Sequence, residues 1–392
     1  MYKRLLPPRL FYFCWFAALG FYIPYIGLYY RAAGLDLAQI GLLVALPGLL
    51  QIIATPLWGL VADGLQIHRV LLPLAVAGTL LPVLLAGRTG SFELLLGLVA
   101  ILALFTAPVT PLADSATLAL LGDQRSRYGA LRVWGAVGWG LSTLAAGALV
   151  QRLGLAIVFP SYALIGALAV LVAVLLPRAS LPQVDLRSAA LTMARDVRWA
   201  RFLGCIFLIG CCNAMINGFL SLYLQDLGAG GEQIGLAIAI ASISELPVLV
   251  FAPLVLRRWG ARPLLICAGL LYALRAGIYV VAPSLGWALA AQVLHGPCFA
   301  ALWTGGVDEA QRLAPKGMEV TAQSLFGTMF FGVATAIASV VAGWIYRDLG
   351  SGALFSIGSL VALLGALGML AGRRRGDMAT EAIVSETQRS GM

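Results

Sequence analysis

The sequence AQIGLLVA at residues 38–45 recurs as EQIGLAIA at residues 232–239. The offset from Gln39 to Gln233 is 194 residues, and the same offset aligns flanking residues of the two copies: Leu28, Tyr29 and Gly34 with Leu222, Tyr223 and Gly228. Matches on both sides of one turn, at a single offset, indicate that the chain contains an internal duplication.

The duplicated stretches lie in a chain that is too apolar to be a soluble protein. Of its 392 residues, 61% are hydrophobic and 11% are charged, which is far from the composition of a soluble domain. A membrane-spanning helix needs roughly 20 apolar residues, and by that criterion there are about twelve such stretches. They lie near 10–30, 38–62, 70–87, 92–121, 129–150, 155–177, 202–224, 233–256, 263–282, 285–307, 319–345 and 352–372.

The two copies of the repeat are six spans apart and therefore share one orientation in the membrane. Parallel halves of this kind are one of the repeat architectures of transporters. We therefore predict an all-α membrane protein with twelve transmembrane helices in two parallel six-helix halves. The predicted parts are an N-terminal half (1–177), a cytoplasmic linker (178–201), a C-terminal half (202–372) and a disordered cytoplasmic tail (373–392).

The basic residues are distributed unequally between the two sides of these spans. Twenty lysines and arginines fall on the side of the two termini, and two, Arg132 and Arg275, lie within spans. Only four lie on the opposite side: Arg31, Arg88, Arg152 and Arg347. Because cytoplasmic loops carry the excess of basic residues, we expect both termini in the cytoplasm of a multi-pass protein of the bacterial inner membrane. The net charge of +9 then reflects membrane topology, and no nucleic-acid partner is expected.

Five ionisable side chains lie inside apolar spans: Asp114, Arg132, Glu245, Arg275 and His295. A charge at membrane depth costs a few kcal/mol or more, and such residues mark solute or proton pathways by default. The alternative is structural, with Asp114–Arg132 and Glu245–Arg275 as static bridges between helices. His295 and a tryptophan in the fifth span, Trp139, could likewise serve packing alone.

Residues 59–69, GLVADGLQIHR, resemble the loop signature of the major facilitator superfamily between its second and third helices. Gly59, Asp63 and Arg69 fit the signature, whereas Gly64 and Gln66 depart from it. The resemblance implies the major facilitator fold, and it implies that Asp63 and Arg69 belong to a cytoplasmic gate.

Two further runs resemble the fourth and fifth helices of the branch that contains the phenylpropionate and oligosaccharide proton symporters. They are PLADS at 111–115 and RYGALRVWGAVGW at 127–139. This resemblance implies that Asp114, Arg132 and Trp139 bind the solute. We also expect Tyr25, on the first predicted helix, to line the solute cavity.

The second half resembles the same branch in SELPVLVFA (244–252), LRAGI (274–278) and QVLHGPCF (292–299). The resemblance implies that Glu245, Arg275 and His295 take part in proton coupling. Cys298 and Gln292 stand where relatives of the lactose permease type have a glutamate and a lysine. Since a thiol is a poor proton carrier near neutral pH, Glu245 is the predicted carrier.

Together these features predict a secondary active transporter that moves a small organic solute, an aromatic acid or a sugar, by alternating access. The chain lacks a G-x-x-x-x-G-K-[ST] motif for nucleotide, so energy would come from a gradient, with the proton as coupling ion. The six cysteines have no zinc-ligand spacing, and no cofactor or metal is expected. The expected partners are the solute, protons and the lipid bilayer, with the protein a monomer. Alternatives are an exporter of drug-like compounds, a uniporter, a membrane sensor and an intramembrane enzyme.

Overall fold

The computed structural model describes residues 5–65, 70–177, 193, 196–282, 284–315 and 318–371. Within these ranges every regular element is helical. The predicted tail, 373–392, and most of the predicted linker, 178–201, fall outside them.

The first group of helices begins with two prolines, Pro7 and Pro8, which suit the first turn of a helix because their missing N–H groups need no partner there. The predicted span 92–121 is divided at Pro108, since proline interrupts the helical hydrogen-bond ladder. The helices of this group are α1 (Leu6–Ala32), α2 (Leu37–Leu65), α3 (Leu71–Ala86), α4 (Phe92–Thr106), α5 (Val109–Leu121), α6 (Tyr128–Leu153) and α7 (Val158–Ala173), with short 3₁₀ turns at Gly122–Arg127 and Leu155–Ile157.

The second group begins at Val197, inside the predicted linker, because Asp196 caps the helix. Its carboxylate accepts a hydrogen bond of 2.8 Å from the N–H of Arg198, and this bond lowers the pKa of Asp196. The helices are α9 (Val197–Asp226), α10 (Gly231–Trp259), α11 (Ala261–Val281), α12 (Leu285–Ala290), α13 (His295–Leu313), α14 (Glu319–Gly327) and α15 (Ala334–Ala371), with a 3₁₀ turn at Ala291–Leu294 and a π-helical turn at Thr328–Val333. The run called α15 turns sharply at Gly350, whose φ is 83°.

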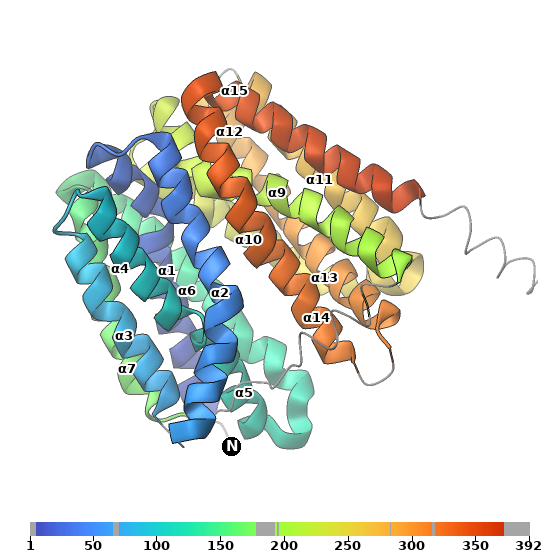
Figure 1. Cartoon of the computed structure of the whole chain (residues 1–392), viewed down its shortest axis with the longest axis horizontal. Helices are drawn as coiled ribbons and strands as arrows, with labels where there is room; N and C mark the ends of the chain where they lie inside the picture. Colours follow the sequence, from blue (N-terminus) through green and yellow to red (C-terminus); the bar gives the residue numbers. More distant parts are fainter. Residues whose placement is uncertain are drawn as a thin grey trace, which may run out of the picture.

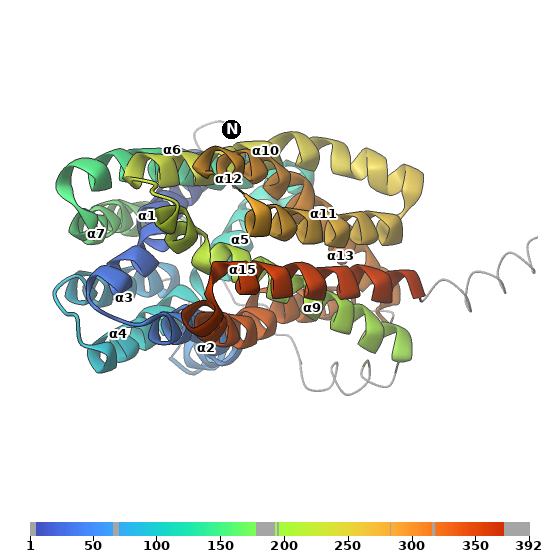
Figure 2. The same ribbon diagram turned by 90° about the horizontal axis from the view of Figure 1, so that it is seen from above.

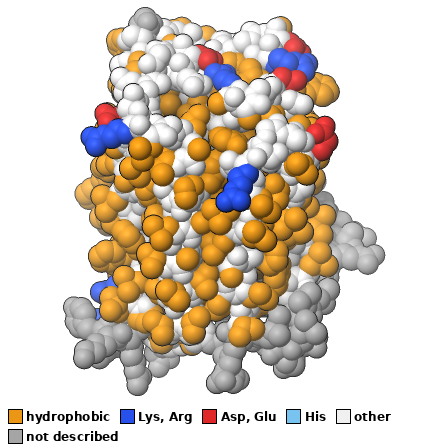
Figure 3. Space-filling view, turned by 90° about the vertical axis from the view of Figure 1, so that its left-hand side faces the viewer, with side chains coloured by type: hydrophobic (Ala, Val, Ile, Leu, Met, Phe, Trp, Pro, Cys, Tyr) orange, Lys and Arg blue, Asp and Glu red, His pale blue; other side chains and the backbone are white. Residues whose placement is uncertain are grey.

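Nine segments of the described chain are long and apolar enough to cross a membrane. Figure 3 shows one face of the molecule covered mainly by hydrophobic side chains, with the few visible charged side chains mostly in its upper part. The chain is thus a multi-pass membrane protein.

Helices α1–α7 lie on one side of the molecule and α9–α15 on the other (Figures 1 and 2). The two groups are joined mainly along two seams, where α6 packs on α10 and α2 packs on α15. Away from these seams the groups diverge towards the end that carries α5 and α14 (Figure 1).

The sequence repeat is also a repeat of backbone geometry. Gly34 and Gly228 both have positive φ, 91° and 84°, a conformation that favours glycine. After each glycine the chain closes the preceding helix by the same bond, from Leu35 N to Tyr30 O (3.1 Å) and from Ala229 N to Leu224 O (2.9 Å). This is the hydrogen-bond pattern of a Schellman motif.

An aromatic pair repeats beside these turns. The rings of Tyr29 and Phe159 meet edge to face at 4.6 Å and 75°, and those of Tyr223 and Phe355 at 4.9 Å and 76°. The two groups of helices therefore share details of side-chain packing as well as sequence.

The two groups are held together by charge at one end, which we call the closed end. There Arg31, at the end of α1, forms an ion pair of 2.6 Å with Asp226, at the end of α9. The Tyr346 hydroxyl donates to the same carboxylate, and Arg347 lies 3.9 Å from Asp36. The two arginine–aspartate contacts cross from one group of helices to the other, and the Tyr346 hydrogen bond holds Asp226 in place within the second group.

Candidate solute and proton site

Asp114 lies on α5 and is held by tyrosines as well as by arginine. The hydroxyl of Tyr12, on α1, donates a hydrogen bond of 2.6 Å to Asp114 Oδ1, and the Tyr128 hydroxyl also interacts with this carboxylate. Short hydrogen bonds to an ionised carboxylate are stronger than hydrogen bonds between neutral groups. Asp114 is therefore fixed in place even without its ionic partner.

Arg132, on α6, is the ionic partner, and the pair is a loose one. Its Nε lies 3.9 Å from Asp114 Oδ1, and about a third of each side chain is exposed. The guanidinium lies over the Phe16 ring at 4.3 Å and the Tyr12 ring at 5.3 Å. Aromatic faces attract a cation without using its N–H groups, so the arginine is oriented while donors stay available for another partner.

Trp139 is half-buried on α6, two turns beyond Arg132 and on the same face of the helix. Tyr25 is instead completely buried, and its hydroxyl points between the main-chain oxygens of Thr143 and Gly231. In this conformation Tyr25 can reach a solute only if α6 and α10 separate, and its role as a lining residue stays a prediction.

Arg275 is fully buried on α11 and is surrounded by neutral partners. It donates from Nε to the Tyr279 hydroxyl (3.0 Å) and from Nη2 to Gln292 Oε1 (2.8 Å), while Nη1 lies 3.0 Å from His295 Nδ1. Gln292 in turn donates to Tyr279 (2.9 Å). A buried arginine needs such hydrogen bonds to offset the loss of water.

The contact with Arg275 defines the protonation state and tautomer of His295. Arginine can only donate, so Nδ1 must accept, and the imidazole is then neutral with its proton on Nε2. His295 is also the first of three parallel rings on α13, stacked with Phe299 at 5° and, through it, with Trp303 at 16°. In this conformation His295 accepts a hydrogen bond from Arg275 and carries no second proton.

Glu245 lies on α10 where this helix crosses α13. A Cβ atom added at Gly296 would collide with the main chain of Ser244 and Glu245, and Gly296 N donates to Ser244 Oγ (2.9 Å). The positive charge that acts on Glu245 is that of Arg132, in the other group of helices. Among the described residues Glu245 forms no ion pair with Arg275, so the static bridge considered from the sequence is not present.

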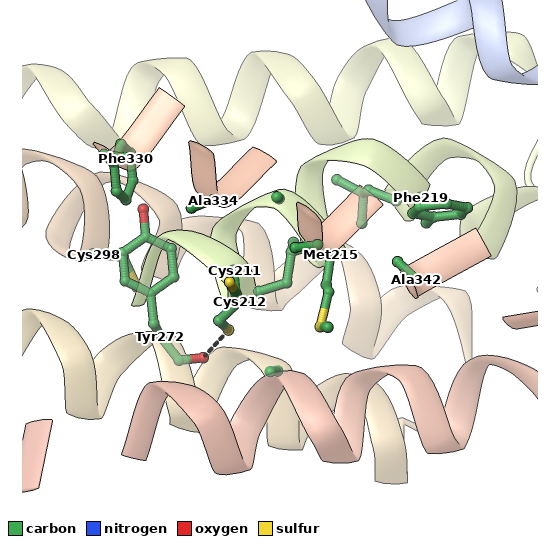
Figure 4. Packing of buried hydrophobic residues seen from close by; sticks show 14 of the residues in the cluster. Cys211, Cys212, Met215, Phe219, Tyr272, Cys298, Phe330, Ala334 and Ala342 are labelled. Carbon is green, nitrogen blue, oxygen red and sulfur yellow. Dashed lines mark hydrogen bonds between the residues drawn. The ribbon is translucent and has the colours of Figure 1, made fainter. Parts of the chain in front are cut away.

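Cys298 lies in the apolar core behind this site. It is completely buried and, in Figure 4, lies near Tyr272 and Cys212, whose thiol donates to the Tyr272 carbonyl at 3.8 Å. No cluster of metal ligands occurs in the part of the chain that the structure describes. The gate residues lie beyond that part: Arg69 is outside the described residues, as is the side chain of Asp63 in α2.

Sequence reasoning did not identify Tyr12, Phe16, Tyr128 or Tyr279. Their aromatic side chains are common in apolar helices, and only the packing of α1 against α5 and α6 reveals that two of them contact Arg132. The run YGALR at 128–132 contained a signal for Tyr128, since residues four apart share a helix face.

Buried charges at membrane depth, inside a set of spanning helices with repeated geometry, are the features of a multi-pass membrane transporter. The chain belongs to the MFS_1 like family, which matches residues 6–357, and so to the major facilitator superfamily. The family resemblance predicted from the sequence is thereby confirmed.

Named relatives agree with this class. The chain is 30% identical over 368 residues to the maltose permease of Geobacillus stearothermophilus, covering 92% of each protein. It is 28% identical over 362 residues to the "Probable 3-phenylpropionic acid transporter" of Escherichia coli (strain K12), covering 90% of this chain and 93% of that one. The crystal structure of the nucleoside transporter NupG superimposes with a TM-score of 0.83 at 17% identity, over 94% of this chain and 98% of that one, which supports the fold. These relatives are transporters, in agreement with the prediction that the chain is not an enzyme.

Proposed function

We propose that the protein is a proton-coupled importer of a small organic solute, working as a monomer in a bacterial inner membrane by alternating access. Two six-helix halves, with twelve spans in all, would rock about a site between them. The nine candidate spans support this count once α3 and α10 are added and the last, 51-residue segment is divided at Gly350.

The proposed orientation has both termini in the cytoplasm, as the distribution of lysine and arginine favours. The closed end then faces the outside, because the turns at Gly34, Gly154, Gly228 and Gly350 all lie on the side opposite the termini. The described conformation is accordingly assigned as inward-facing.

For the solute, we assign Arg132 and Trp139 as the binding pair and Asp114 as the residue that orients Arg132. A guanidinium binds carboxylates and sugar hydroxyls, and an indole ring stacks on planar groups or on the face of a sugar. Relatives named for maltose and 3-phenylpropionic acid make a sugar or an aromatic acid the solute class that this pair suits.

For the proton, we assign Glu245 as the carrier, with Arg275 and His295 as neighbours that shape its surroundings. The assignment rests on two features: Glu245 is an acid inside a membrane span, and the charge of Arg132, in the other half, acts on it. Neutralising Glu245 would alter the field at the solute-binding arginine, which links proton binding to solute binding.

The experiment begins with a counterflow screen of the purified protein in vesicles against maltose, 3-phenylpropionate and uridine. With the solute so found, uptake should acidify wild-type vesicles that contain a pH-sensitive dye. Glu245→Gln should lose this acidification and still exchange solute, whereas the exposed Glu93→Gln on α4 should behave as wild type.

Three results would contradict the proposal. If wild-type uptake moves no protons, the protein is a uniporter, an alternative that the neutral surroundings of Arg275 favour. If Glu245→Gln also loses exchange, Glu245 is part of the solute site and another group carries the proton. Net outward movement of the solute down a proton gradient would identify an exporter.

A further inference from the structure

Backbone meets backbone where α6 crosses α10 at the closed end. A Cβ atom on Gly147 would lie 2.6 Å from the main-chain oxygen of Gly231, and one on Gly235 would lie 2.5 Å from that of Thr143. Any side chain at these two glycines would push the helices apart, so the crossing depends on glycine.

The other seam, where α2 crosses α15, has the same construction. A Cβ atom on Gly41 would lie 2.5 Å from the main-chain oxygen of Ser339, and one on Gly343 would collide with that of Leu37. The internal repeat relates the two crossings, since the offset of 194 residues takes Gly41 to Gly235 and Leu37 to Gly231.

The crossings differ in one functional group. Tyr25 of α1 directs its hydroxyl into the α6–α10 crossing, 3.1 Å from Thr143 O on its own side and 3.3 Å from Gly231 O on the other. It is completely buried. One hydroxyl thus spans the seam and ties it with a hydrogen bond shared between two carbonyls.

At the same offset, the counterpart of Tyr25 is Phe219 of α9, which has no hydroxyl. Its ring is also completely buried, packs edge to face on Tyr346 at 5.9 Å, and lies beside Ala342 of α15 (Figure 4). The nearby Ser339 hydroxyl is buried and has no hydrogen-bond partner in the described structure. The α2–α15 crossing therefore has the shape of the first crossing without its hydrogen bond.

We propose that the Tyr25 hydroxyl acts as a latch: its hydrogen bond stabilises the closed form of the α6–α10 crossing. The α2–α15 crossing has no such latch, because Phe219 lacks the hydroxyl. The inference rests on the alternating access of the proposed function, but on neither the solute nor the coupling ion. Losing the hydroxyl favours the state in which the closed end is open. Adding a hydroxyl at residue 219 favours the closed state, because symmetry directs it towards the oxygens of Ser339 and Leu37.

Spin labels on opposite halves measure this equilibrium directly. Arg88 and Ser284 are exposed at the closed end, one on each half, and would be replaced by labelled cysteines after Cys14 and Cys267 are changed to alanine. A neutral hydrogen bond corresponds to about a two- to tenfold change in an equilibrium constant. Tyr25→Phe should raise the ratio of long to short label distances by that factor, Phe219→Tyr should lower it, and the double variant should return towards the parent.

Tyr22→Phe is the matched control, because this buried tyrosine of the same helix packs on Tyr162 within its own half (5.5 Å). Its distance distribution should equal that of the parent. An unchanged distribution in Tyr25→Phe overturns the latch, whatever happens to thermal stability. An unchanged or more open distribution in a folded Phe219→Tyr overturns the symmetry argument. Because the measurement needs no transport, it stands apart from the outcome for Glu245→Gln.

Discussion

The hydroxyl of Tyr12 lies closer to Asp114 than Arg132 does: 2.6 Å against 3.9 Å, both to Oδ1. In this conformation the hydrogen bond to Asp114 Oδ1 comes from the tyrosine, and the arginine stays at ion-pair distance. We infer that the bond from Tyr12 favours this loose ion pair, which leaves donors of the guanidinium available for a solute.

Tyr12→Phe is therefore expected to weaken solute binding. Without the hydroxyl, Asp114 should turn towards Arg132 and occupy its donors. We expect about a two- to tenfold loss of affinity, the range for one hydrogen bond, with unchanged yield of folded protein. Titration of the purified variant with the solute found by counterflow measures this change, and an affinity equal to that of wild type would remove Tyr12 from the site.

Arg132→Ala should abolish transport while the protein still inserts at normal yield. An ionic hydrogen bond to the solute corresponds to about 1.5–3 kcal/mol, or roughly ten- to a hundredfold in affinity. Arg132→Lys should retain part of the activity, since it keeps the charge but loses the flat contact with Phe16. Arg88→Ala, at an exposed turn, is the control. Near-normal uptake by a well-expressed Arg132→Ala would show that the pair is structural.

His295→Gln should preserve proton movement, because glutamine can still offer an oxygen to Arg275 and the imidazole is neutral here. His295→Leu should instead lower stability by about 1–3 kcal/mol, the cost of leaving a buried donor unpaired. Dye acidification and thermal unfolding of the two variants separate these effects. Loss of acidification with solute exchange intact in His295→Gln would make the histidine the proton carrier.

Gly296→Ala should destabilise the protein by about 1–3 kcal/mol, as overpacking does. The new methyl group would meet the main chain of Ser244 and Glu245, and α10 would have to move away from α13. Gly97→Ala on α4 is the control, since a Cβ atom there has nothing within 4 Å. Tryptophan fluorescence during heating measures the unfolding midpoints of the two variants. Equal midpoints would mean that α10 and α13 are packed less tightly at Gly296 than described.

Topology can be checked in intact cells with a maleimide that does not cross membranes. A cysteine in place of the exposed Arg152 should react from outside, and one in place of Arg198 should react only after permeabilisation. The parent protein provides the blank for its own cysteines. The reverse pattern would place the termini outside and make the closed end cytoplasmic.

The sequence predicted features that depend on neighbouring residues, such as helical spans and turns. It did not predict contacts between side chains on distant helices. The repeat predicted the paired turns at Gly34 and Gly228, because glycine is needed at positive φ. The charges within apolar spans indicated five candidate site residues, whose roles stay predictions. The sequence did not predict which charged residues interact. The charge that acts on Glu245 depends on how the two halves are placed, and the partners of Arg275 depend on how α11 and α13 are rotated.

The glycine crossings also have a consequence for the rate of the conformational change. Where main chain rests on main chain, two helices can separate without any side chain at the contact having to change rotamer. We therefore expect the rate at which the closed end opens to be governed by the few polar contacts around these crossings, the Arg31–Asp226 ion pair among them. Turnover should then respond more to salt, which screens that exposed ion pair, than to the viscosity of the surrounding lipid.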